Sequence, residues 1–484
     1  MFGSRGLQIL LMLWSGISGL GIPTTGNNII KGVDMKTRKT FFVSFGFLCL
    51  GLVPISAMGQ SLPHTFSANT AAKASEVNEN FTYLLERFGT RKTTVNCSGG
   101  ESITTALQNY NHIVISGICT ENLSLNATSL PHRLVILEGT SSSSDGISAS
   151  DTSKEVVEIF NGGITLKATN LEFKNGSYGI SAYRGPTVIL KNVSIKDNSK
   201  DGLYLGGGTY GRIIDSSVTN NSGTQIFAGY NSTLILKGST ITGNTSSSSI
   251  KIFSGSSSNI VNNTIKKGKF GIEVDLGSTA VIGVSSEGNS IQSAQEGIHV
   301  TGGSSVQSGY NTINLNSGTQ VWIDGGSSVK IEGGSITGNS SYEAIKVNNS
   351  TLTLADVTIS GGKQGIAAVF NSTVRLEGGN TISGNTENGV RMYNSTMFQY
   401  SDDDSTTIES NTSEEIYARR SYLELTDVII KGSSGSNEID LRNGSYLKLF
   451  SGSSVTGTVN CGNTSPDNGT FVNDSGTTVT TSGC

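Results

Sequence analysis

Short stretches in which apolar and polar residues alternate recur along most of the chain. From about residue 175 to 460, each repeat has a small or polar residue, two apolar residues separated by one other, a turn, and two further short apolar stretches, the last ending near an Asn. The eleven steps from Ile180 to Ile439 average about 23.5 residues, the period of a solenoid with three short strands per coil. The apolar residues that open the repeats are Ile180, Leu203, Ile226, Ile250, Ile272, Ile298, Val321, Ile345, Ile366, Val390, Ile416 and Ile439.

The alternation predicts an all-β fold, a parallel β-helix over residues 95–460 with about 23–24 residues per coil. Within each strand one side chain would enter a stacked core and the next would face solvent, so successive coils would bury a continuous column of Ile, Val and Leu. Leucine-rich repeats have a similar period, but they need a recurring Leu framework and a helix. No helical periodicity occurs in these repeats, which favours the β-helix.

A column of asparagines recurs three residues after the apolar position of the third strand. Asparagine tolerates left-handed backbone geometry, and stacked amides can hydrogen-bond from coil to coil. We therefore expect these residues to be structural, and the many Asn-x-Ser/Thr triplets to reflect composition rather than glycosylation. The column comprises Asn198, Asn221, Asn244, Asn316, Asn339, Asn385 and Asn411.

Two segments at the start of the repeats carry a recognisable pattern. Residues 97–107 read CSGGESITTAL, and residues 112–125 read HIVISGICTENLSL. They resemble the first coil of the pectin-lyase-like superfamily, in which a short helix reading Ile-x-x-Ala-Leu precedes a strand and a Gly-x-x-x-Glu-Asn-Leu turn. The resemblance implies a right-handed β-helix. It implies no single activity, because the superfamily includes lyases, hydrolases, esterases, epimerases, phage tailspikes and catalytically silent surface proteins.

The region before the repeats has the features of an export signal. Met35 begins a charged stretch, residues 41–53 are apolar, and a small-residue segment ends near Gln60. This order predicts a cleaved signal peptide over residues 35–59, with residues 1–34 as a gene-model extension. Cys49 follows Leu48 rather than a small residue, so we expect no lipid anchor and no stable membrane anchor. The protein is predicted to be secreted or extracellular, with the periplasm and the cell surface left open.

Residues 60–94 contain the one convincing amphipathic helix, at residues 71–88. A capping helix would cover the open end of the solenoid. The same apolar spacing is also heptad-like, so a short trimeric coiled coil is the alternative. With under two heptads, a monomer is favoured over a trimer. The stripe consists of Ala74, Val77, Phe81, Leu84 and Phe88.

Four cysteines follow the predicted signal peptide. An even number in an exported chain indicates disulfides, and two cysteines lie near each end of the mature chain. We predict the pairs Cys97–Cys119 and Cys461–Cys484, the second closing a C-terminal cap over residues 461–484. Four free thiols are the alternative.

The charge balance excludes one class of partner. The chain has 484 residues, 33 Lys and Arg against 37 Asp and Glu, and a net charge of −4. A nucleic-acid-binding protein would carry a basic patch, and no basic run occurs outside the N-terminal region. No nucleic-acid partner is therefore expected.

The outward residue of each lead strand defines a predicted surface ladder. Neighbouring coils are about 4.8 Å apart, so successive members should be adjacent. Aromatic faces and charged groups on a rigid sheet suit an extracellular polysaccharide. The alternative is that outward positions hold polar and aromatic residues merely to stabilise the sheet. The candidate ligand-binding residues are Tyr204, Phe227, Lys251, Trp322, Lys346, Arg391 and Tyr417.

Catalysis is a separate question, because no complete motif is present. Residues 321–324 read VWID and resemble a Trp-Ile-Asp-His stretch of pectate lyases, but Gly325 stands where His belongs. The corresponding pectinesterase, polygalacturonase and alginate epimerase motifs are absent as well. Two carboxyls at suitable separation could still hydrolyse a glycosidic bond, and a base could abstract a proton next to a uronate. The candidate catalytic residues are Glu273, Asp275, His299 and Asp324.

Three hypotheses follow for the function. The favoured one is a secreted β-helix that presents a glycan-binding face. The second is a polysaccharide lyase or glycoside hydrolase, and the third a structural or adhesive surface protein. Short, uniform coils favour the first and third, because enzymes on such scaffolds carry their catalytic residues on long loops. No cofactor is expected; the acidic turn at residues 402–404 could bind calcium, but a solvated turn is the favoured interpretation.

Overall fold

The computed structural model describes residues 90–400, 404–432, 437–462 and 468–484. Residues 90–484 form one compact unit. The predicted signal peptide, the extension at residues 1–34 and the helix at residues 71–88 lie outside the described residues, as do Asp402 and Asp403.

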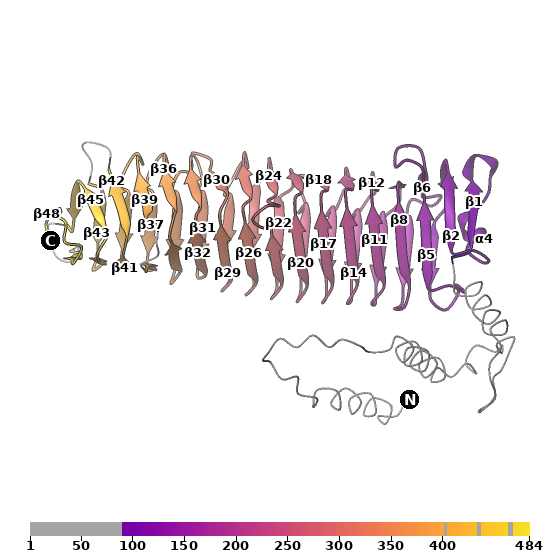
Figure 1. Ribbon diagram of the computed structural model, residues 1–484, viewed down its shortest axis with the longest axis horizontal. Coiled ribbons are helices and arrows are strands. Elements are labelled where there is room, and N and C mark those ends of the chain that lie inside the picture. Colours follow the sequence, from indigo (N-terminus) through magenta and orange to yellow (C-terminus); the bar gives the residue numbers. More distant parts are fainter. Residues whose placement is uncertain (1–89, 401–403, 433–436, 463–467) are drawn as a thin grey trace, which may run out of the picture. The chain divides into compact units, whose positions relative to one another are not determined.

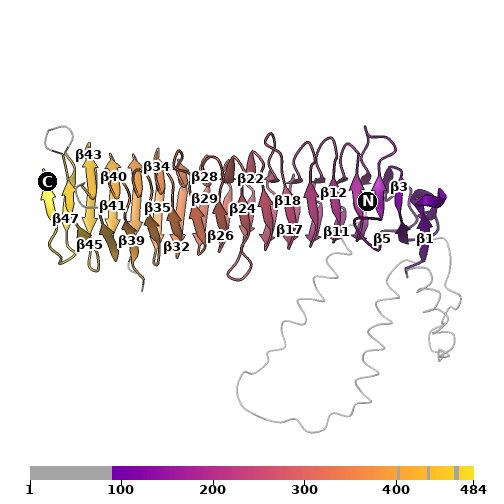
Figure 2. The same ribbon diagram turned by 90° about the horizontal axis from the view of Figure 1, so that it is seen from above.

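Three parallel sheets, called A, B and C here, run side by side along the solenoid (Figures 1 and 2). Sheet A has 17 strands: β1 (Lys92–Asn96), β2 (His112–Ser116), β5 (Leu134–Glu138), β8 (Thr165–Thr169), β11 (Thr187–Lys191), β14 (Tyr210–Ile214), β17 (Thr233–Lys237), β20 (Ser257–Val261), β23 (Thr279–Ile282), β26 (Ser305–Gly309), β29 (Ser328–Glu332), β32 (Thr351–Ala355), β35 (Thr373–Glu377), β38 (Thr396–Gln399), β41 (Tyr422–Leu425), β44 (Tyr446–Leu449) and β47 (Thr470–Asn473).

Sheet B has 15 strands: β3 (Ile118–Thr120), β6 (Gly146–Ser148), β9 (Glu172–Lys174), β12 (Ser194–Lys196), β15 (Ser217–Thr219), β18 (Thr240–Thr242), β21 (Thr264–Lys266), β24 (Ser290–Gln292), β27 (Thr312–Asn314), β30 (Ser335–Thr337), β33 (Thr358–Ser360), β36 (Thr381–Ser383), β39 (Thr406–Glu409), β42 (Val428–Lys431) and β45 (Ser454–Thr456).

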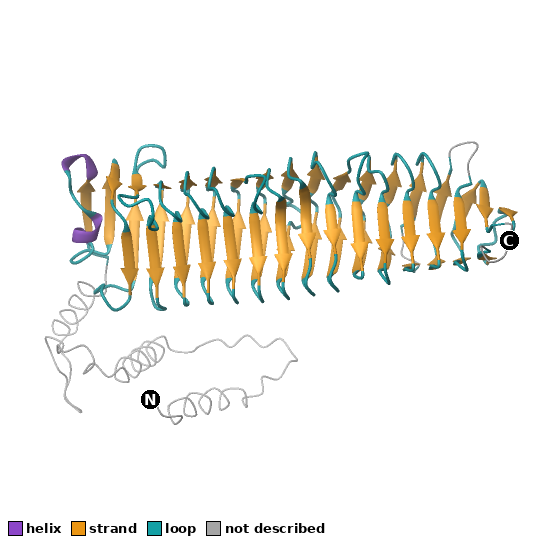
Figure 3. Ribbon diagram, turned by 180° about the vertical axis from the view of Figure 1, so that it is seen from behind, coloured by secondary structure: helices purple, strands orange, loops and turns teal. Residues whose placement is uncertain are grey.

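Sheet C has 16 strands: β4 (Leu123–Asn126), β7 (Val157–Phe160), β10 (Ile180–Tyr183), β13 (Leu203–Gly206), β16 (Ile226–Gly229), β19 (Ile250–Phe253), β22 (Phe270–Asp275), β25 (Glu296–Val300), β28 (Val321–Ile323), β31 (Ile345–Asn348), β34 (Ile366–Val369), β37 (Val390–Tyr393), β40 (Ile416–Arg419), β43 (Ile439–Arg442), β46 (Thr458–Asn460) and β48 (Thr480–Ser482). Among the described residues the helices are η2 (Cys97–Gly99) and α4 (Ile103–Ala106), both at the N-terminal end (Figure 3).

Each complete coil contributes one strand to sheet C, then one to sheet A, then one to sheet B. Equivalent strands pair in register from coil to coil, so that Ile180 lies beside Leu203 and Leu203 beside Ile226. All twelve predicted lead residues are at most 1% exposed. The predicted parallel β-helix is confirmed. Fully burying each such side chain stabilises the fold by roughly 1.5–3 kcal/mol.

The asparagine column is confirmed as structural, but its backbone geometry was predicted wrongly. Asn198 donates its amide to Asn221 at 2.8 Å, and Asn385 donates to Asn411 at 2.7 Å. The left-handed residue is instead the one before each buried Asn, because it makes the turn that aims the amide inward. These preceding residues are Asp197, Asn220, Leu315, Gly384 and Ser410. The partly exposed Asn244 interrupts the ladder and donates to backbone carbonyls of the preceding coil.

A second ladder, of serines, lines the corner between sheets C and A. Buried hydroxyls accept the backbone N–H of the preceding coil, as Ser256 does from Ser232 at 3.1 Å and Ser350 from Ser327 at 3.1 Å. The residue before the serine is often a left-handed Asn, as at Asn231 and Asn349. The frequent Asn-Ser-Thr triplets therefore form this corner between sheets C and A.

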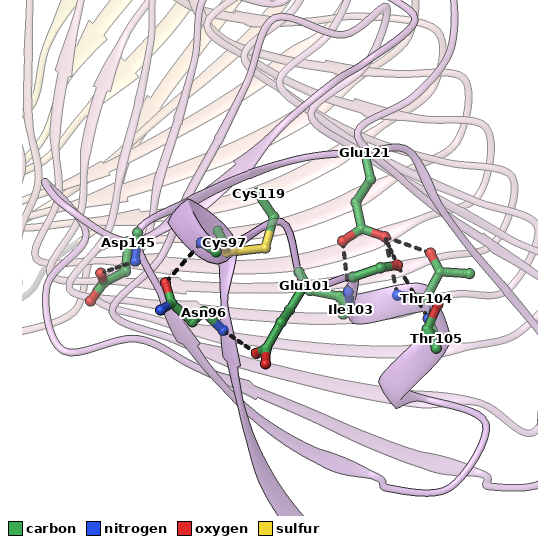
Figure 4. The surroundings of a disulfide bond; sticks show 12 residues. Asn96, Cys97, Glu101, Ile103, Thr104, Thr105, Cys119, Glu121 and Asp145 are labelled. Atoms are coloured by element: carbon green, nitrogen blue, oxygen red, sulfur yellow. Dashed lines mark hydrogen bonds between the residues drawn. A yellow bond between two sulfur atoms is a disulfide. The ribbon is translucent and has the colours of Figure 1, made fainter.

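The first coil is held together by a carboxylate and a disulfide (Figure 4). Glu121 accepts the backbone N–H of Ile103 at 2.7 Å and of Thr104 at 3.1 Å, which caps the start of α4. The predicted disulfide Cys97–Cys119 ties η2 to β3. Within the Glu-Asn-Leu turn, Glu121 therefore caps α4, whereas Leu123 is buried in the core.

The second predicted disulfide, Cys461–Cys484, is also present. It lies where β48 pairs with β46 at the end of sheet C. The bond therefore secures the last strand of that sheet.

Candidate functional site: the outward face of sheet C

The outward face of sheet C carries three columns of side chains. The middle column is the predicted ladder, and its register is confirmed from Tyr204 through Phe227, Lys251 and Glu273 to His299, Trp322 and Lys346. A second column lies two residues further along each strand. A third lies two residues before each lead residue, beyond a buried position held by residues such as Gly202 and Gln225.

An aromatic group occupies the N-terminal half of this face. It comprises Tyr178, Tyr204, Phe227, Tyr230 and Phe253. The rings of Tyr204 and Phe227 are stacked, with centroids 4.9 Å apart and planes within 4°. Tyr178 meets Tyr204 edge-on at 5.8 Å, and Phe253 lies 6.1 Å from Phe227.

Stacking along the solenoid axis covers ring faces inside the ladder. Adjacent rungs are about 4.8 Å apart, so parallel rings on neighbouring coils cover one another's faces and leave only edges toward solvent. Tyr230 differs because it stands on the corner between sheets C and A, with a left-handed backbone (φ 59°). Its ring meets Phe253 edge-on at 5.7 Å and is 49% exposed. Tyr230 is thus the ring of this group most open to a ligand.

Glu273 and Asp275 are already engaged within the protein. Glu273 forms an ion pair with Lys251 at 2.8 Å and accepts a hydrogen bond from Ser248, and its side chain is only 10% exposed. Asp275 accepts the backbone N–H of Leu276 at 2.6 Å. The register places Glu273 beside His299, yet the bonds that Glu273 makes are to Lys251 and Ser248. These two predicted catalytic carboxylates therefore have structural partners.

A second group, the central cluster, surrounds His299. It comprises Glu296, His299, Trp322, Asp324 and Lys346. The His299 ring lies 4.6 Å from Trp322, with planes 20° apart, and its Nε2 is 3.6 Å from Asp324 Oδ2. The Lys346 ammonium lies 5.2 Å from the centre of the Trp322 ring. Four predicted site residues thus come together here.

Glu296 is the member of the cluster that was not predicted. Its pKa is raised to about 7, chiefly by burial and in smaller part by the Asp324 carboxylate, whereas Lys269 and Lys346 oppose the shift. Glu296 lies in the third column, two residues before Ile298, and that column holds none of the predicted site residues. A count back from each lead residue could have found it.

A second unpredicted carboxyl lies in the same third column beside the aromatic group. Burial raises the pKa of Asp201 to about 6, although the backbone N–H of Thr224 donates to it at 2.8 Å. Burial and the Asp201 charge together raise the pKa of Tyr178. The aromatic group therefore has an ionisable side chain at its edge.

Arg391 and Tyr417, also predicted to bind ligand, lie farther along the middle column. They are adjacent to one another in register, and Arg391 lies two coils beyond Lys346 of the central cluster. Beyond them, Asp440 pairs with Arg442 at 2.8 Å and accepts from Asn460 at 3.0 Å. The middle column is therefore continuous, but its charged residues do not converge on one site.

Within residues 90–400 and the three shorter described segments, no group of three or more His, Cys, Asp or Glu side chains could hold a metal ion. No helix in those same segments is long and apolar enough to cross a membrane.

The three sheets and their register define a parallel β-helix protein, and sequence comparison gives its hand. Residues 155–313 match a family model described as a right-handed β-helix region. A search of curated proteins finds no significant match.

Two solved structures are similar to this chain, both A-modules of mannuronan C-5 epimerases from Azotobacter vinelandii. The AlgE6 module is 12% identical over 79% of this chain and 100% of its own, with a TM-score of 0.35. The AlgE4 module is 13% identical over 82% of this chain and 98% of its own, with a TM-score of 0.28.

Proposed function

We propose that this protein is exported and binds an extracellular polysaccharide on the outward face of sheet C. The observation that carries the proposal is the aromatic group, in which Tyr230 is half exposed above a packed set of rings. Sugar-binding sites combine an aromatic surface with a few polar groups that fix orientation. The two disulfides support export, because disulfides persist in oxidising compartments.

Polar groups flank the aromatic group on both sides. The Lys200 ammonium lies 5.1 Å from the centre of the Tyr178 ring, and the Lys251 ammonium lies 5.1 Å from the centre of the Phe253 ring. Asp201 adds a carboxyl on the same edge. Sugar hydroxyls both donate and accept hydrogen bonds, so ammonium and carboxyl groups beside an apolar surface suit them.

The test is retention on a polysaccharide panel by the wild-type protein and by Tyr230→Ala. We expect the variant to lose at least tenfold in affinity for any retained polymer, with only a small change in thermal unfolding from the lost edge contact with Phe253. Tyr310→Ala is the matched control, because Tyr310 is also a left-handed corner tyrosine (φ 54°, 42% exposed) but lies between sheets A and B. Equal loss in both variants would contradict a site on sheet C.

The same panel separates the three functional hypotheses. New reducing or unsaturated ends in the retained polymer would favour the lyase or hydrolase. Failure to retain any polymer would favour the structural or adhesive protein. We expect retention without cleavage, because two of the four predicted catalytic residues are engaged by Lys251, Ser248 and the backbone of Leu276.

A further inference from the structure

The central cluster contains an unusual concentration of unpartnered polar atoms. In the described part of the chain, twelve buried side-chain N and O atoms have no hydrogen-bond partner within the protein, and five of them belong to this cluster. They are Glu296 Oε2, both ring nitrogens of His299, Trp322 Nε1 and Asp324 Oδ1. Buried polar atoms are nearly always paired, so such a concentration calls for a binding partner.

The side chains next to these atoms are long and weakly held. Lys346 lies against the Trp322 ring, and Lys269 lies 4.9 Å from the centre of the Phe270 ring. Phe270 in turn contacts His299, with ring centroids 4.6 Å apart. Among the described residues neither ammonium has a carboxylate within ion-pair distance. Both lysines can therefore swing away without breaking an ion pair.

The chemistry of the unpartnered atoms indicates the kind of ligand. Trp322 Nε1 can only donate, an ionised Asp324 can only accept, and a neutral His299 offers one donor and one acceptor. A hydroxyl group does both at once, so a pair of sugar hydroxyls could satisfy several of these atoms. A carboxylate on the ligand could not donate a hydrogen bond to Asp324 and would be repelled by its charge.

We propose that the central cluster is a subsite for one neutral sugar residue, bound through its hydroxyl groups when the Lys346 side chain moves off the indole ring. This proposal rests on the proposed glycan-binding function and adds the place where one sugar of the polymer is bound. The subsite would recognise hydroxyls mainly at the ring edge, because His299 covers one face of the Trp322 ring and Lys346 covers the other until its side chain moves. His299, the member of the subsite nearest to the aromatic group in the middle column, is three rungs from Phe227, about 14 Å. One sugar therefore cannot contact both His299 and Phe227.

Trp322 provides a direct probe of the subsite. The chain has two tryptophans, Trp14 and Trp322, so a Trp14→Phe background leaves Trp322 as the single fluorophore. The probes are oligosaccharides from limited hydrolysis of galactomannan and xyloglucan, which are neutral, and of polygalacturonate, which is acidic. We expect a neutral oligosaccharide to change the emission of Trp322 and polygalacturonate to leave it unchanged.

Three variants in the Trp14→Phe background test the hydrogen-bonding roles. Glu296→Gln, His299→Gln and Asp324→Asn should each weaken the fluorescence-detected affinity by tenfold or more. Glu343→Gln is the matched control, because Glu343 occupies the same column as Glu296 two rungs away and has no part in the cluster. Its affinity should equal that of the parent, and thermal unfolding of every variant checks its fold.

The outcomes distinguish the two proposals. If a polymer is retained in a Tyr230-dependent way but no oligosaccharide changes the emission of Trp322, the subsite is wrong and the proposed function stands. If no polymer is retained and no emission changes, both fail. If polygalacturonate changes the emission and Lys346→Ala abolishes that change, the ligand is acidic and the assignment of a neutral sugar is overturned.

Discussion

The imidazole of His299 stacks on the indole of Trp322, with ring centroids 4.6 Å apart and planes 20° apart. The two residues are neighbours in register although 23 positions separate them in the sequence. This spacing is that of adjacent coils, so any two aromatic residues on consecutive rungs can stack in the same way. The ladder thereby stabilises itself and leaves ring edges, rather than ring faces, toward a ligand.

Replacing Trp322 with Ala should therefore affect stability as well as binding. The change removes a stack worth about 0.5–1.5 kcal/mol and a cation–π contact of comparable size. We expect the free energy of unfolding to fall by roughly 1–2 kcal/mol, measured by chemical denaturation. Trp322→Phe keeps a ring between His299 and Lys346 and should recover most of the loss. A fully stable Trp322→Ala protein would show that the stack contributes nothing.

The inside and outside positions of sheet C can be tested with two neighbouring residues. Ile345 is fully buried, whereas Lys346 faces outward. Ile345→Asp should destabilise the protein by several kcal/mol, because a carboxylate enters the core without a partner. Lys346→Asp should cost only about 1 kcal/mol, mostly through the lost contact with Trp322. Equal shifts in thermal unfolding would mean that the assigned register is wrong.

A buried carboxyl should make stability depend on pH. Glu415 is fully buried, in a column where other coils hold Gln225 and Gln320. Burial raises its pKa, and the carboxylates of Glu438 and Glu409 add to the shift. The folded state therefore binds the proton more tightly than the unfolded state, so stability is lost as pH rises through the raised pKa.

Glu415→Gln should remove that loss, because an amide keeps the contact with Asn411 without a charge. We expect the variant to unfold at a higher temperature than the wild type at neutral pH and at a similar temperature in acid. Glu414→Gln is the control, since Glu414 is only partly buried and accepts a hydrogen bond from Asn388. A pH-independent gap between Glu415→Gln and the wild type would contradict the assigned cause.

Loss of the first disulfide should act locally. In a solenoid each coil contacts mainly its neighbours, so a double Cys97→Ser, Cys119→Ser variant should loosen the N-terminal coils. We expect about 2–5 kcal/mol lower stability there, seen as faster amide exchange in β1 and β2. Exchange in β31 should be unchanged. Uniformly faster exchange along the chain would show that the coils unfold as one unit instead.

The fold could be predicted from the sequence because its determinants are local. Period-two alternation fixes which side chains enter the core, and the 23-residue step fixes which strands pair. The middle column of sheet C followed from the same arithmetic. The backbone conformation of the Asn column could not be predicted in this way, because a corner holds several polar residues and the sequence does not show which one is left-handed.

The candidate site was only partly predictable, for a different reason. His299 and Asp324 were placed together correctly, but the pairing of Glu273 with Lys251 depends on side-chain conformations that periodicity does not specify. Tyr230 and Glu296 were missed because they lie outside the two columns that alternation identifies. Their importance comes from exposure at a corner and from burial beside Asp324, which depend on contacts between coils.

The serine ladder has a consequence for how this protein can change in length. Most of its hydroxyls accept a hydrogen bond from the coil before, as Ser232 does from Thr209 and Ser256 from Ser232. The coil that begins at Leu203 could thus be deleted as residues 203–225, and Ile226 would then follow the preceding coil in the place of Leu203. Ser232 would offer its hydroxyl where Thr209 now stands. Whole coils are therefore the natural unit of insertion and deletion, and a shift of a single residue would turn the core side chains of one coil outward.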